Sequence, residues 1–519
     1  MVVPTRLCRL KSLLGSLLAG WLLLAPLAAG SARAADQLEV QVDGLQLPLD
    51  LQVLEQWSRD PQASPAELGA WLELLGPGSR EQLLRLLRAP LVTDRSLAQQ
   101  LLRSWAGQRV LEELGVLVQT EQGNAGSLVS QTLSDLLARQ PQVTTIELLR
   151  AVPSRQLIVN LDGGLQLAAQ WQRQLQEQRL ALRALRLQPL RQVSAVAPSQ
   201  EPSAPPQRLI LPVPHRSKPL PLQLWRGTAS TWVLLTPGLG GSAAQLQWLA
   251  AGLQQRGWSV LLLDHPGSDE QAVRELLDGR RPPPGAETLP ARLQDLQAVV
   301  QAVQQGSLPP LGERVVLMGH SLGGLTSLLA AGLRPEPGLA RRCQRALAGI
   351  PLINLSRLLQ CQLLEVPLPP PTPLAQPLAG VVSLNGFGSL LWADHGLRRL
   401  QAPVLLLGGS LDLITPPLSE QLQLFLPAAG RGSRLVVVEG GSHFSPVRIQ
   451  QGDQALFQLG EEFVGVEPQR VQALTLLLTA EFLESPERGL PPQRRELGGV
   501  TAYVLNRRAA QAWWDSLRN

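Results

Sequence analysis

Short, continuous apolar runs alternate with helical patterns between about residues 222 and 448. Runs of this kind predict strands that are buried on both faces, and their alternation with helices predicts a mostly parallel sheet with helices on both faces. At about residues 340–379 a proline-dense stretch interrupts the rhythm and indicates an insertion over the sheet edge. The runs that we expect to form strands are residues 231–235, 259–263, 314–318, 380–384, 403–407 and 434–438.

The flanking regions have a different pattern. In residues 35–165 leucines recur at helical spacing, as at positions 83, 84, 86 and 87, so we expect a mainly helical N-terminal domain. Residues 166–221 predict a connector helix followed by a proline-rich linker. Residues 449–519 return to a helical pattern and predict a helical C-terminal extension.

Residues 1–34 have the pattern of a secretory signal peptide. A basic start precedes an apolar core from about Leu13 to Ala29, and small residues suit cleavage before Ala35. A retained membrane anchor is the alternative. No later segment reaches the roughly 18 uninterrupted apolar residues of a membrane span. We therefore expect an exported protein, in the periplasm or an equivalent lumen, with no transmembrane span after cleavage.

Composition and charge exclude two classes of protein. The chain is 44% hydrophobic and 17% charged, which is typical of a globular protein rather than a disordered one. The formal net charge is +5, but residues 1–34 contain four basic residues and no acidic one, so the remainder is nearly neutral. Its basic residues are scattered and form no stripe with interleaved aromatics, which argues against binding of nucleic acid.

The stretch Gly319-His320-Ser321-Leu322-Gly323 carries the strongest chemical signal. It lies between a predicted strand and a small-residue helical pattern, which is the context of a nucleophile elbow. Gly319 and Gly323 leave room for backbone that packs closely around the turn. The free N–H groups at the start of the helix would face a developing anion. We therefore predict that Ser321 is the nucleophile of a hydrolase.

A serine hydroxyl needs a base, which is usually an imidazole held by a carboxylate. His443 follows the last strong strand run, and Asp412 follows the strand run before it. We predict that His443 is the base and Asp412 the acid. His395 is the weaker alternative base and Asp394 the fallback acid.

Acyl transfer also needs N–H donors for the oxyanion. The N–H of Leu322 directly follows the proposed nucleophile. A second donor is expected in the glycine-rich loop after residues 231–235, where Leu239 is the candidate by position; a plain turn is the alternative. No Gly-Lys-Ser/Thr ending follows this loop, so a phosphate-binding loop is not expected. This chemistry needs neither a metal nor an organic cofactor.

Two cysteines, Cys343 and Cys361, lie outside the signal-like segment. An even number of cysteines in an exported protein permits a disulfide. Two buried free thiols are the alternative.

At these residues the chain resembles the α/β-hydrolase superfamily, whose members have the chain order serine, acid, histidine. More narrowly, it resembles the dienelactone-hydrolase-like proteins of cyanobacteria that carry an N-terminal helical domain of unknown function. It is similar, more distantly, to the plasma-type platelet-activating-factor acetylhydrolases. The narrower resemblance lies in Asp264 to Ser268 and in Leu359 to Gln362. It implies an α/β-hydrolase fold and a cyanobacterial setting, where the thylakoid lumen is a second possible location.

The chain departs from these families at two positions. Pro237 stands where family members generally have a histidine before the glycine of the oxyanion loop. Dienelactone hydrolases proper use a cysteine nucleophile, and Ser321 here favours ester chemistry.

We therefore expect a secreted serine hydrolase that cleaves a small-molecule or lipid carboxylic ester through an acyl-enzyme. The N-terminal domain and residues 340–379 are expected to cover the site and to select apolar acyl groups. The alternatives are a non-catalytic binding or scaffold protein on the same fold, and an acyltransferase or thioesterase. The sequence does not specify the oligomeric state.

Overall fold

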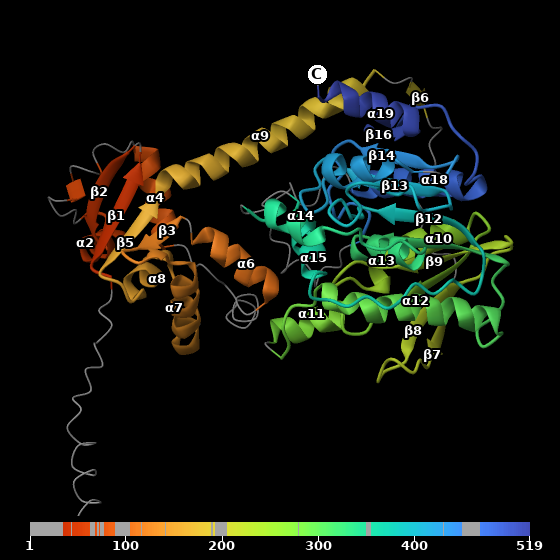
Figure 1. The fold of residues 1–519 in the computed structure, drawn as a ribbon, viewed down its shortest axis with the longest axis horizontal. Coiled ribbons are helices and arrows are strands. Elements are labelled where there is room, and N and C mark those ends of the chain that lie inside the picture. The colour runs from red at the N-terminus through yellow and green to blue at the C-terminus, as the bar shows by residue number, and fades with distance from the viewer. Residues whose placement is uncertain are drawn as a thin grey trace, which may run out of the picture. The chain divides into compact units, whose positions relative to one another are not determined.

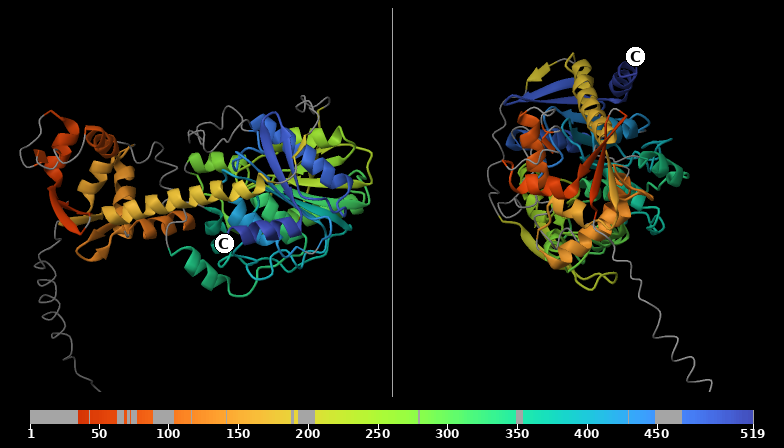
Figure 2. Two further views of the ribbon diagram at one scale, coloured as in Figure 1. Left: turned by 90° about the horizontal axis from the view of Figure 1, so that it is seen from above. Right: turned by 90° about the vertical axis from the view of Figure 1, so that its left-hand side faces the viewer.

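The structure is a computed structural model, and it divides into two compact units. One unit comprises residues up to 93 together with residues 115–163, and the other comprises residues 94–114 and those from 164 onward. Figure 1 and Figure 2 draw both as ribbons. The segment predicted as a signal peptide lies outside the described residues. The structure describes residues 35–42, 44–62, 68–69, 72, 77–88, 104–115, 117–140, 142–187, 190–192, 205–278, 280–348, 354–428, 430–448 and 468–518.

The N-terminal unit is a mixed sheet with helices, so the expectation of a mainly helical domain is wrong. Its described strands lie in the order β2-β1-β5-β3-β4, and β1 pairs antiparallel with β2 and parallel with β5. The strands are β1 (Gln37–Val42), β2 (Leu45–Asp50), β3 (Val118–Thr120), β4 (Gly123–Asn124) and β5 (Gln156–Asn160). The described helices of this unit are α2 (Leu51–Arg59), α4 (Pro77–Arg88), α7 (Gly126–Arg139) and α8 (Thr145–Ala151).

The physical reason for the error lies in the first strand. Residues 37–42 alternate polar and apolar side chains with a period of two, which is the pattern of a half-buried strand. Gly44 has a φ of +75°, which lets the chain turn tightly into β2. Leucines at helical spacing do form α2 and α4 around it, and their buried members share one core with Leu157 of β5.

The second unit contains the predicted mostly parallel sheet. In the described residues its strands lie in the order β6-β15-β16-β14-β13-β12-β11-β9-β10-β8-β7. The six central strands are parallel, and antiparallel strands flank them on both sides. The central strands are β9 (Thr231–Thr236), β10 (Ser259–Leu263), β11 (Arg314–His320), β12 (Leu378–Leu384), β13 (Val404–Gly409) and β14 (Arg434–Val438). The flanking strands are β6 (Leu190–Gln192), β7 (Gln207–Leu211), β8 (Leu220–Trp225), β15 (Gln493–Leu497) and β16 (Val500–Leu505).

Helices cover both faces of this sheet, as predicted. Successive residues of β9 enter different cores: Trp232 and Leu234 join the cluster with α12 and α13, whereas Val233 and Leu235 join the cluster with α10 and α18. Continuous apolar strands follow from this burial on two faces. The helices of this unit include α10 (Gln247–Gln254), α11 (Glu270–Leu277), α12 (Leu289–Gln304), α13 (Leu322–Ala330), α16 (Gln423–Phe425), α18 (Pro468–Glu484) and α19 (Arg507–Ser516).

Both flanks of the sheet extend further than the sequence pattern indicated. Strand β7 lies in the region predicted as a linker, β8 begins at its end and continues into the predicted hydrolase domain, and β15 and β16 lie in the extension predicted as helical. The β15–β16 connection is a two-residue turn at Gly498 and Gly499, whose φ values are +57° and +85°. A Gly-Gly pair between two short runs is a hairpin signal that helical periodicity obscured. The connector prediction does contain a helix, α9 (Leu161–Leu185).

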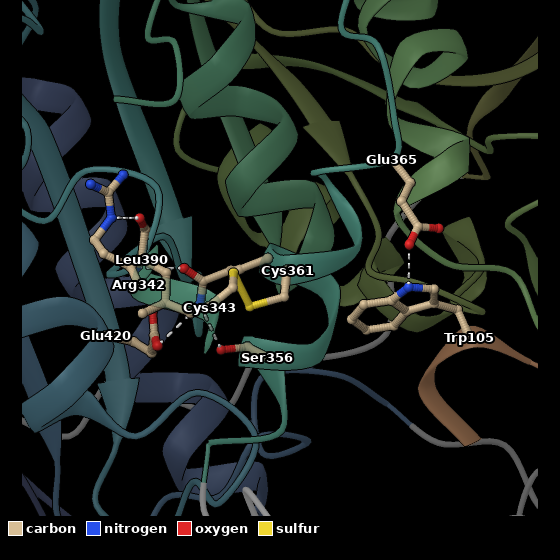
Figure 3. Close-up of a disulfide and its surroundings, with 9 residues drawn as sticks. Trp105, Arg342, Cys343, Ser356, Cys361, Glu365, Leu390 and Glu420 are labelled. Carbon is tan, nitrogen blue, oxygen red and sulfur yellow. Dashed lines mark hydrogen bonds between the residues drawn. A yellow bond between two sulfur atoms is a disulfide. The ribbon is translucent and has the colours of Figure 1, made fainter. Parts of the chain in front are cut away.

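The predicted insertion contains two short helices, α14 (Leu339–Ala346) and α15 (Ser356–Gln362). Cys343 and Cys361 join these two helices in a disulfide (Figure 3). Beyond α15, the Glu365 carboxylate accepts a hydrogen bond of 2.8 Å from the indole of Trp105, at the start of α6 (Trp105–Leu114). Among the described residues, no helix is both long enough and apolar enough to span a membrane.

Candidate active site

Ser321 occupies a strained turn between β11 and α13. Its φ is 53° and its ψ is −119°, a backbone conformation that residues other than glycine rarely adopt. A Cβ on Gly319 would lie 2.2 Å from the backbone of Gly323, and a Cβ on Gly323 would lie 2.5 Å from the carbonyl oxygen of Thr236. Both glycines are therefore required by close backbone packing. The Ser321 side chain is largely buried at this turn.

Asp412 follows β13 and is fully buried. One of its oxygens, Oδ1, accepts the backbone N–H groups of Ile414 and Thr415 at 2.8 and 2.7 Å. The other, Oδ2, accepts the Asn385 amide and the Thr415 hydroxyl, each at 2.6 Å. Burial alone would raise the pKa of Asp412. The attraction of His443 and the hydrogen bonds from His443, Asn385 and Thr415 instead lower it to about 2, so the carboxylate is ionised at neutral pH.

His443 lies in the loop after β14, and its Nδ1 is 2.9 Å from Oδ2 of Asp412. This contact fixes the ring and leaves Nε2 as the other nitrogen for proton transfer. The His443 carbonyl accepts a 2.8 Å hydrogen bond from Nε2 of His320, the residue before Ser321. Burial and the neighbouring His443 lower the pKa of His320 to about 3, so His320 is a neutral donor that ties the His443 loop to the serine turn.

Strand register brings these residues to one edge of the sheet. The N–H of Ser321 donates to Leu384 of β12 at 2.8 Å, and the N–H of Asn385 donates to Leu407 of β13 at 2.6 Å. The N–H of Ser410 donates to Val438 of β14 at 2.9 Å. Because β11 to β14 are parallel neighbours, the residues that follow them meet at their carboxyl ends.

The alternative acid and base lie elsewhere. The backbone N–H groups of Asp394 and His395 donate to the carboxylate of Glu336 at 2.9 and 3.0 Å. His395 also turns its Nδ1 to Glu336 at 3.2 Å, and its side chain is 46% exposed. Among the described residues, the side-chain partner of His395 is Glu336 rather than Ser321 or Asp412.

The glycine-rich loop after β9 lies directly against the serine. A Cβ on Gly238 would be 3.2 Å from the Cβ of Ser321. The next glycine, Gly240, has a φ of +71° and donates its N–H to the Ser268 carbonyl at 2.8 Å. Within the part of the chain that the structure describes, the N–H groups of Leu239 and Leu322 have no hydrogen-bond acceptor. Both are thus available to a bound oxyanion.

The sequence pattern did not single out Asn385 and Thr415, which hold Asp412. Asn385 follows β12 with a φ of 48°, and its buried Oδ1 has no hydrogen-bond partner within the described part of the chain. The Thr415 hydroxyl also lies 3.2 Å from Nδ1 of His443. The position of Asn385 directly after a predicted strand was the available signal, because strands that end at one edge contribute polar residues to the same site.

A second buried carboxylate fixes the insertion to the Asp412 loop. Glu420 lies on one turn of π-helix, Pro417–Leu422, and accepts the N–H groups of Gly388 and Ser389, both at 2.9 Å. It also accepts the side-chain amides of Asn354 and Gln360 at 2.6 and 3.2 Å. Figure 3 shows Glu420 beside Ser356, whose N–H donates to the Ile414 carbonyl at 3.0 Å. The position of α15 therefore depends on the segment that follows Asp412.

No group of three or more histidine, cysteine or carboxylate side chains suited to hold a metal ion occurs among the described residues. The arrangement places a histidine paired with an ionised carboxylate and a serine on a strained turn at one sheet edge, which are the groups that proton transfer and nucleophilic attack require.

Comparison with known proteins identifies two family matches. Residues 34–160 match a family described as "Alpha/beta hydrolase of unknown function (DUF1400)", and residues 233–456 match one described as "Alpha/beta hydrolase family". No curated protein matches the chain. Among solved structures, a crystal structure of dienelactone hydrolase from Anabaena variabilis ATCC 29413 is 19% identical, with a TM-score of 0.34. That alignment covers 54% of this chain and 99% of the dienelactone hydrolase chain.

Proposed function

We propose that this chain, which has the fold and the family matches of the α/β hydrolases, is a serine hydrolase that cleaves carboxylic esters through an acyl-enzyme on Ser321. The observation that carries the proposal is the strained backbone of Ser321, with φ 53° and ψ −119°. Strain of this kind persists only where the surrounding structure enforces it, and it clusters at active sites. The buried Asp412–His443 pair at the same sheet edge supplies the matching base.

The residues divide the chemistry between them. His443 removes the proton of the Ser321 hydroxyl as its oxygen attacks the ester carbonyl, and Asp412 stabilises the resulting imidazolium. The N–H groups of Leu239 and Leu322 stabilise the oxyanion of the tetrahedral intermediate. His443 then returns the proton to the leaving alcohol, and a water molecule releases the acid from the acyl-enzyme by the same steps. Asn385 and Thr415 hold Asp412, and the Thr415 hydroxyl also lies beside Nδ1 of His443.

The narrower assignment to apolar acyl esters is also part of the proposal. It is supported by two exposed leucines that flank α15, Leu355 directly before it and Leu364 two residues after it, which are 37% and 49% exposed. The more distant resemblance to the plasma-type platelet-activating-factor acetylhydrolases favours the same substrate class. The expectation that the N-terminal domain covers the site stays a prediction.

Export remains a proposal as well. It rests on the signal-like pattern of residues 1–34 and is supported by the Cys343–Cys361 disulfide, since disulfides persist mainly in oxidising compartments. Cell fractionation, with mass spectrometry of the N-terminus of the isolated protein, tests it. A protein that retains residues 1–34 in the cytoplasmic fraction would refute it.

Fluorophosphonate labelling of the purified protein tests the catalytic assignment. We expect labelling of the wild type, none in Ser321→Ala, and a strong reduction in His443→Ala. Ser327→Ala is the matched control, because Ser327 is a buried serine of α13 that should not affect labelling. Equal labelling of wild type and Ser321→Ala would show that the nucleophile is misassigned. No labelling of the folded wild type would favour a binding protein instead.

A panel of p-nitrophenyl esters of different chain length then defines the substrate class. Product analysis with added alcohols separates hydrolysis from transfer to an acceptor other than water. Dominant transfer products would replace the hydrolase assignment by an acyltransferase.

A further inference from the structure

Arg292 is a fully buried guanidinium on α12, and the proposed mechanism does not use it. Among the described residues no carboxylate oxygen lies within ion-pair distance of it. Burial lowers the pKa of Arg292 to about 9, with Asp295 acting in the opposite direction, so the group is still charged at neutral pH. A buried charge without a paired carboxylate is costly, and its retention requires strong hydrogen bonds.

Those hydrogen bonds converge on the loop that follows β9. The guanidinium donates to two successive backbone carbonyls, that of Pro237 and that of Gly238, the latter at 3.4 Å. It also donates to the hydroxyl of Ser268 at 2.9 Å and to that of Thr236 at 3.4 Å. Arg292 therefore connects the loop after β9 with the loop after β10.

Because the peptide unit is planar, these contacts determine which way the backbone N–H groups of the loop point. In a trans peptide the carbonyl and the N–H point to opposite sides, and none of the described peptide bonds is cis. The Gly238 carbonyl and the Leu239 N–H belong to one peptide unit, so a cation that holds this carbonyl turns the N–H of Leu239 away from itself. Two successive carbonyls on one side leave two successive N–H groups on the other, which is the arrangement of an anion-binding nest.

The remaining side chains of this cluster keep the guanidinium in place. Asp295, one helical turn after Arg292, accepts hydrogen bonds from Arg216 at 2.6 and 2.5 Å. It also holds Nδ1 of His265 at 2.6 Å, and Nε2 of His265 lies 2.6 Å from the Thr236 hydroxyl. Burial and the charge of Arg292 lower the pKa of His265 to about 3. A neutral His265 donates to Asp295 and accepts from Thr236, which leaves the Thr236 oxygen free to accept from Arg292.

We infer that Arg292 is a positioning residue for the oxyanion hole, which orients the Leu239 N–H towards the acyl oxygen by holding the Pro237 and Gly238 carbonyls. The inference rests on the proposed function of Ser321. Arg292 acts by orienting these peptide units and does not touch the substrate, because its guanidinium donates to protein groups only.

Kinetics of Arg292→Met and Arg292→Lys with p-nitrophenyl butyrate test the inference. Loss of an oxyanion donor costs about 100- to 1,000-fold in kcat, so we expect a fall of about 100-fold in Arg292→Met with KM changed less than about threefold. Lysine is a point charge that cannot fork to two carbonyls, so Arg292→Lys should fall by about tenfold. If Arg292→Met does not fold, the lysine variant decides by the same readouts.

The second readout is binding of an aliphatic trifluoromethyl ketone, which forms a tetrahedral oxyanion adduct with an active serine. Its affinity should fall by the same factor as kcat/KM in each Arg292 variant. A merely structural role would lower stability without changing this affinity in the folded fraction.

Arg434→Met is the matched control. Arg434 is also a buried guanidinium that donates to two backbone carbonyls, those of Ser485 and Arg488, but it lies at the amino end of β14. This variant should lose stability and keep both kcat and ketone affinity.

Two outcomes separate the inference from the proposed function. An active wild type whose Arg292 variants keep kcat, or lose kcat without losing ketone affinity, would overturn the role of Arg292 alone. A folded wild type with no ester turnover and no labelling of Ser321 would overturn both.

Discussion

Replacing Ser321 by glycine should make the protein more stable than replacing it by alanine, although both variants lose the nucleophile. The reason is the backbone of Ser321, whose φ of 53° suits glycine and strains every residue with a Cβ. Alanine keeps that strain and glycine removes it. The comparison of the two variants therefore isolates the strain, because the hydroxyl is absent from both.

The magnitude follows from two opposing contributions. A residue held in such a backbone region costs about 1–3 kcal/mol. The greater freedom of glycine in the unfolded chain costs about 0.4–1 kcal/mol in the other direction. Ser321→Gly should thus exceed Ser321→Ala in unfolding free energy by about 1–2 kcal/mol.

Ser327 is the matched control within the same region. It is fully buried inside α13, where its hydroxyl donates to the Gly323 carbonyl at 2.9 Å. In an ordinary helix interior glycine is about 1 kcal/mol less stable than alanine. The sign of the glycine–alanine difference should therefore reverse between Ser321 and Ser327.

Urea unfolding followed by tryptophan fluorescence measures this difference, since most of the 12 tryptophans lie in the second unit. Equal slopes against urea concentration would establish that the variants unfold from comparable states. If glycine at position 321 is less stable than alanine by the same amount as at position 327, the turn stores no strain. The structural basis for assigning Ser321 would then be lost.

Three further predictions concern stability and the acid loop. The pKa of Asp412 is lowered from 3.8 to about 2 in the folded state, so its charge stabilises the fold by about 2 kcal/mol above pH 4. That stability is lost as the pH falls towards 2, so wild type should lose more than Asp412→Asn between pH 5 and 2.5 in urea unfolding; equal losses would contradict this. The double variant of Cys343→Ser and Cys361→Ser should lose about 3 kcal/mol, because the disulfide closes a loop of 18 residues; a loss below about 1 kcal/mol would refute it. Glu420→Gln should cost about 2–3 kcal/mol and lower kcat about tenfold, because it weakens a buried network tied to the Asp412 loop. Glu439, whose side chain is 28% exposed and pairs with Arg186 and Tyr503, is the control, and a similar loss of kcat in Glu439→Gln would show that the Glu420 network has no special role.

The central sheet could be predicted because its strands are buried on both faces, which leaves a continuous apolar run in the sequence. The flanking strands lack this mark. β8 alternates buried and partly exposed residues, and β15 contains three charged residues among its five. Their pairing is specified by the neighbouring strand, so a window of local sequence does not reveal it. The N-terminal sheet was missed for the same reason, since leucine-rich helices pack around short alternating strands.

The residues of the candidate site likewise differ in whether the local sequence indicates them. Ser321 has a local signature, because two glycines and a strand-to-helix switch are needed within five residues. Thr415 and Arg292 have none, and the local signal for Asn385 is its place directly after a predicted strand. Each acts on a group far away in the chain, as Arg292 does on Gly238, which lies 54 residues before it. Sequence could indicate that such residues are polar at a strand end or on a buried helix face, but not which partner they meet.

Strand order supplies the missing information. Each of the six parallel strands ends in, or is followed by, a polar residue at the same edge, and the order β14-β13-β12-β11-β9-β10 sets which of them are neighbours. The last two strands bring Thr236 and His265 together beneath the oxyanion loop. The other four bring the Asp412–His443 pair close to the Ser321 turn, since His320 of that turn donates to the His443 carbonyl. In the proposed mechanism the edge thus has one part for proton transfer and one part that orients backbone N–H groups, and the two meet where Gly238 leaves no room for a side chain beside Ser321. The rate of ester cleavage should therefore depend on His443 and Arg292 in different ways. His443 acts on the proton of the Ser321 hydroxyl, whereas Arg292 acts on the N–H groups that bind the oxyanion of the tetrahedral intermediate.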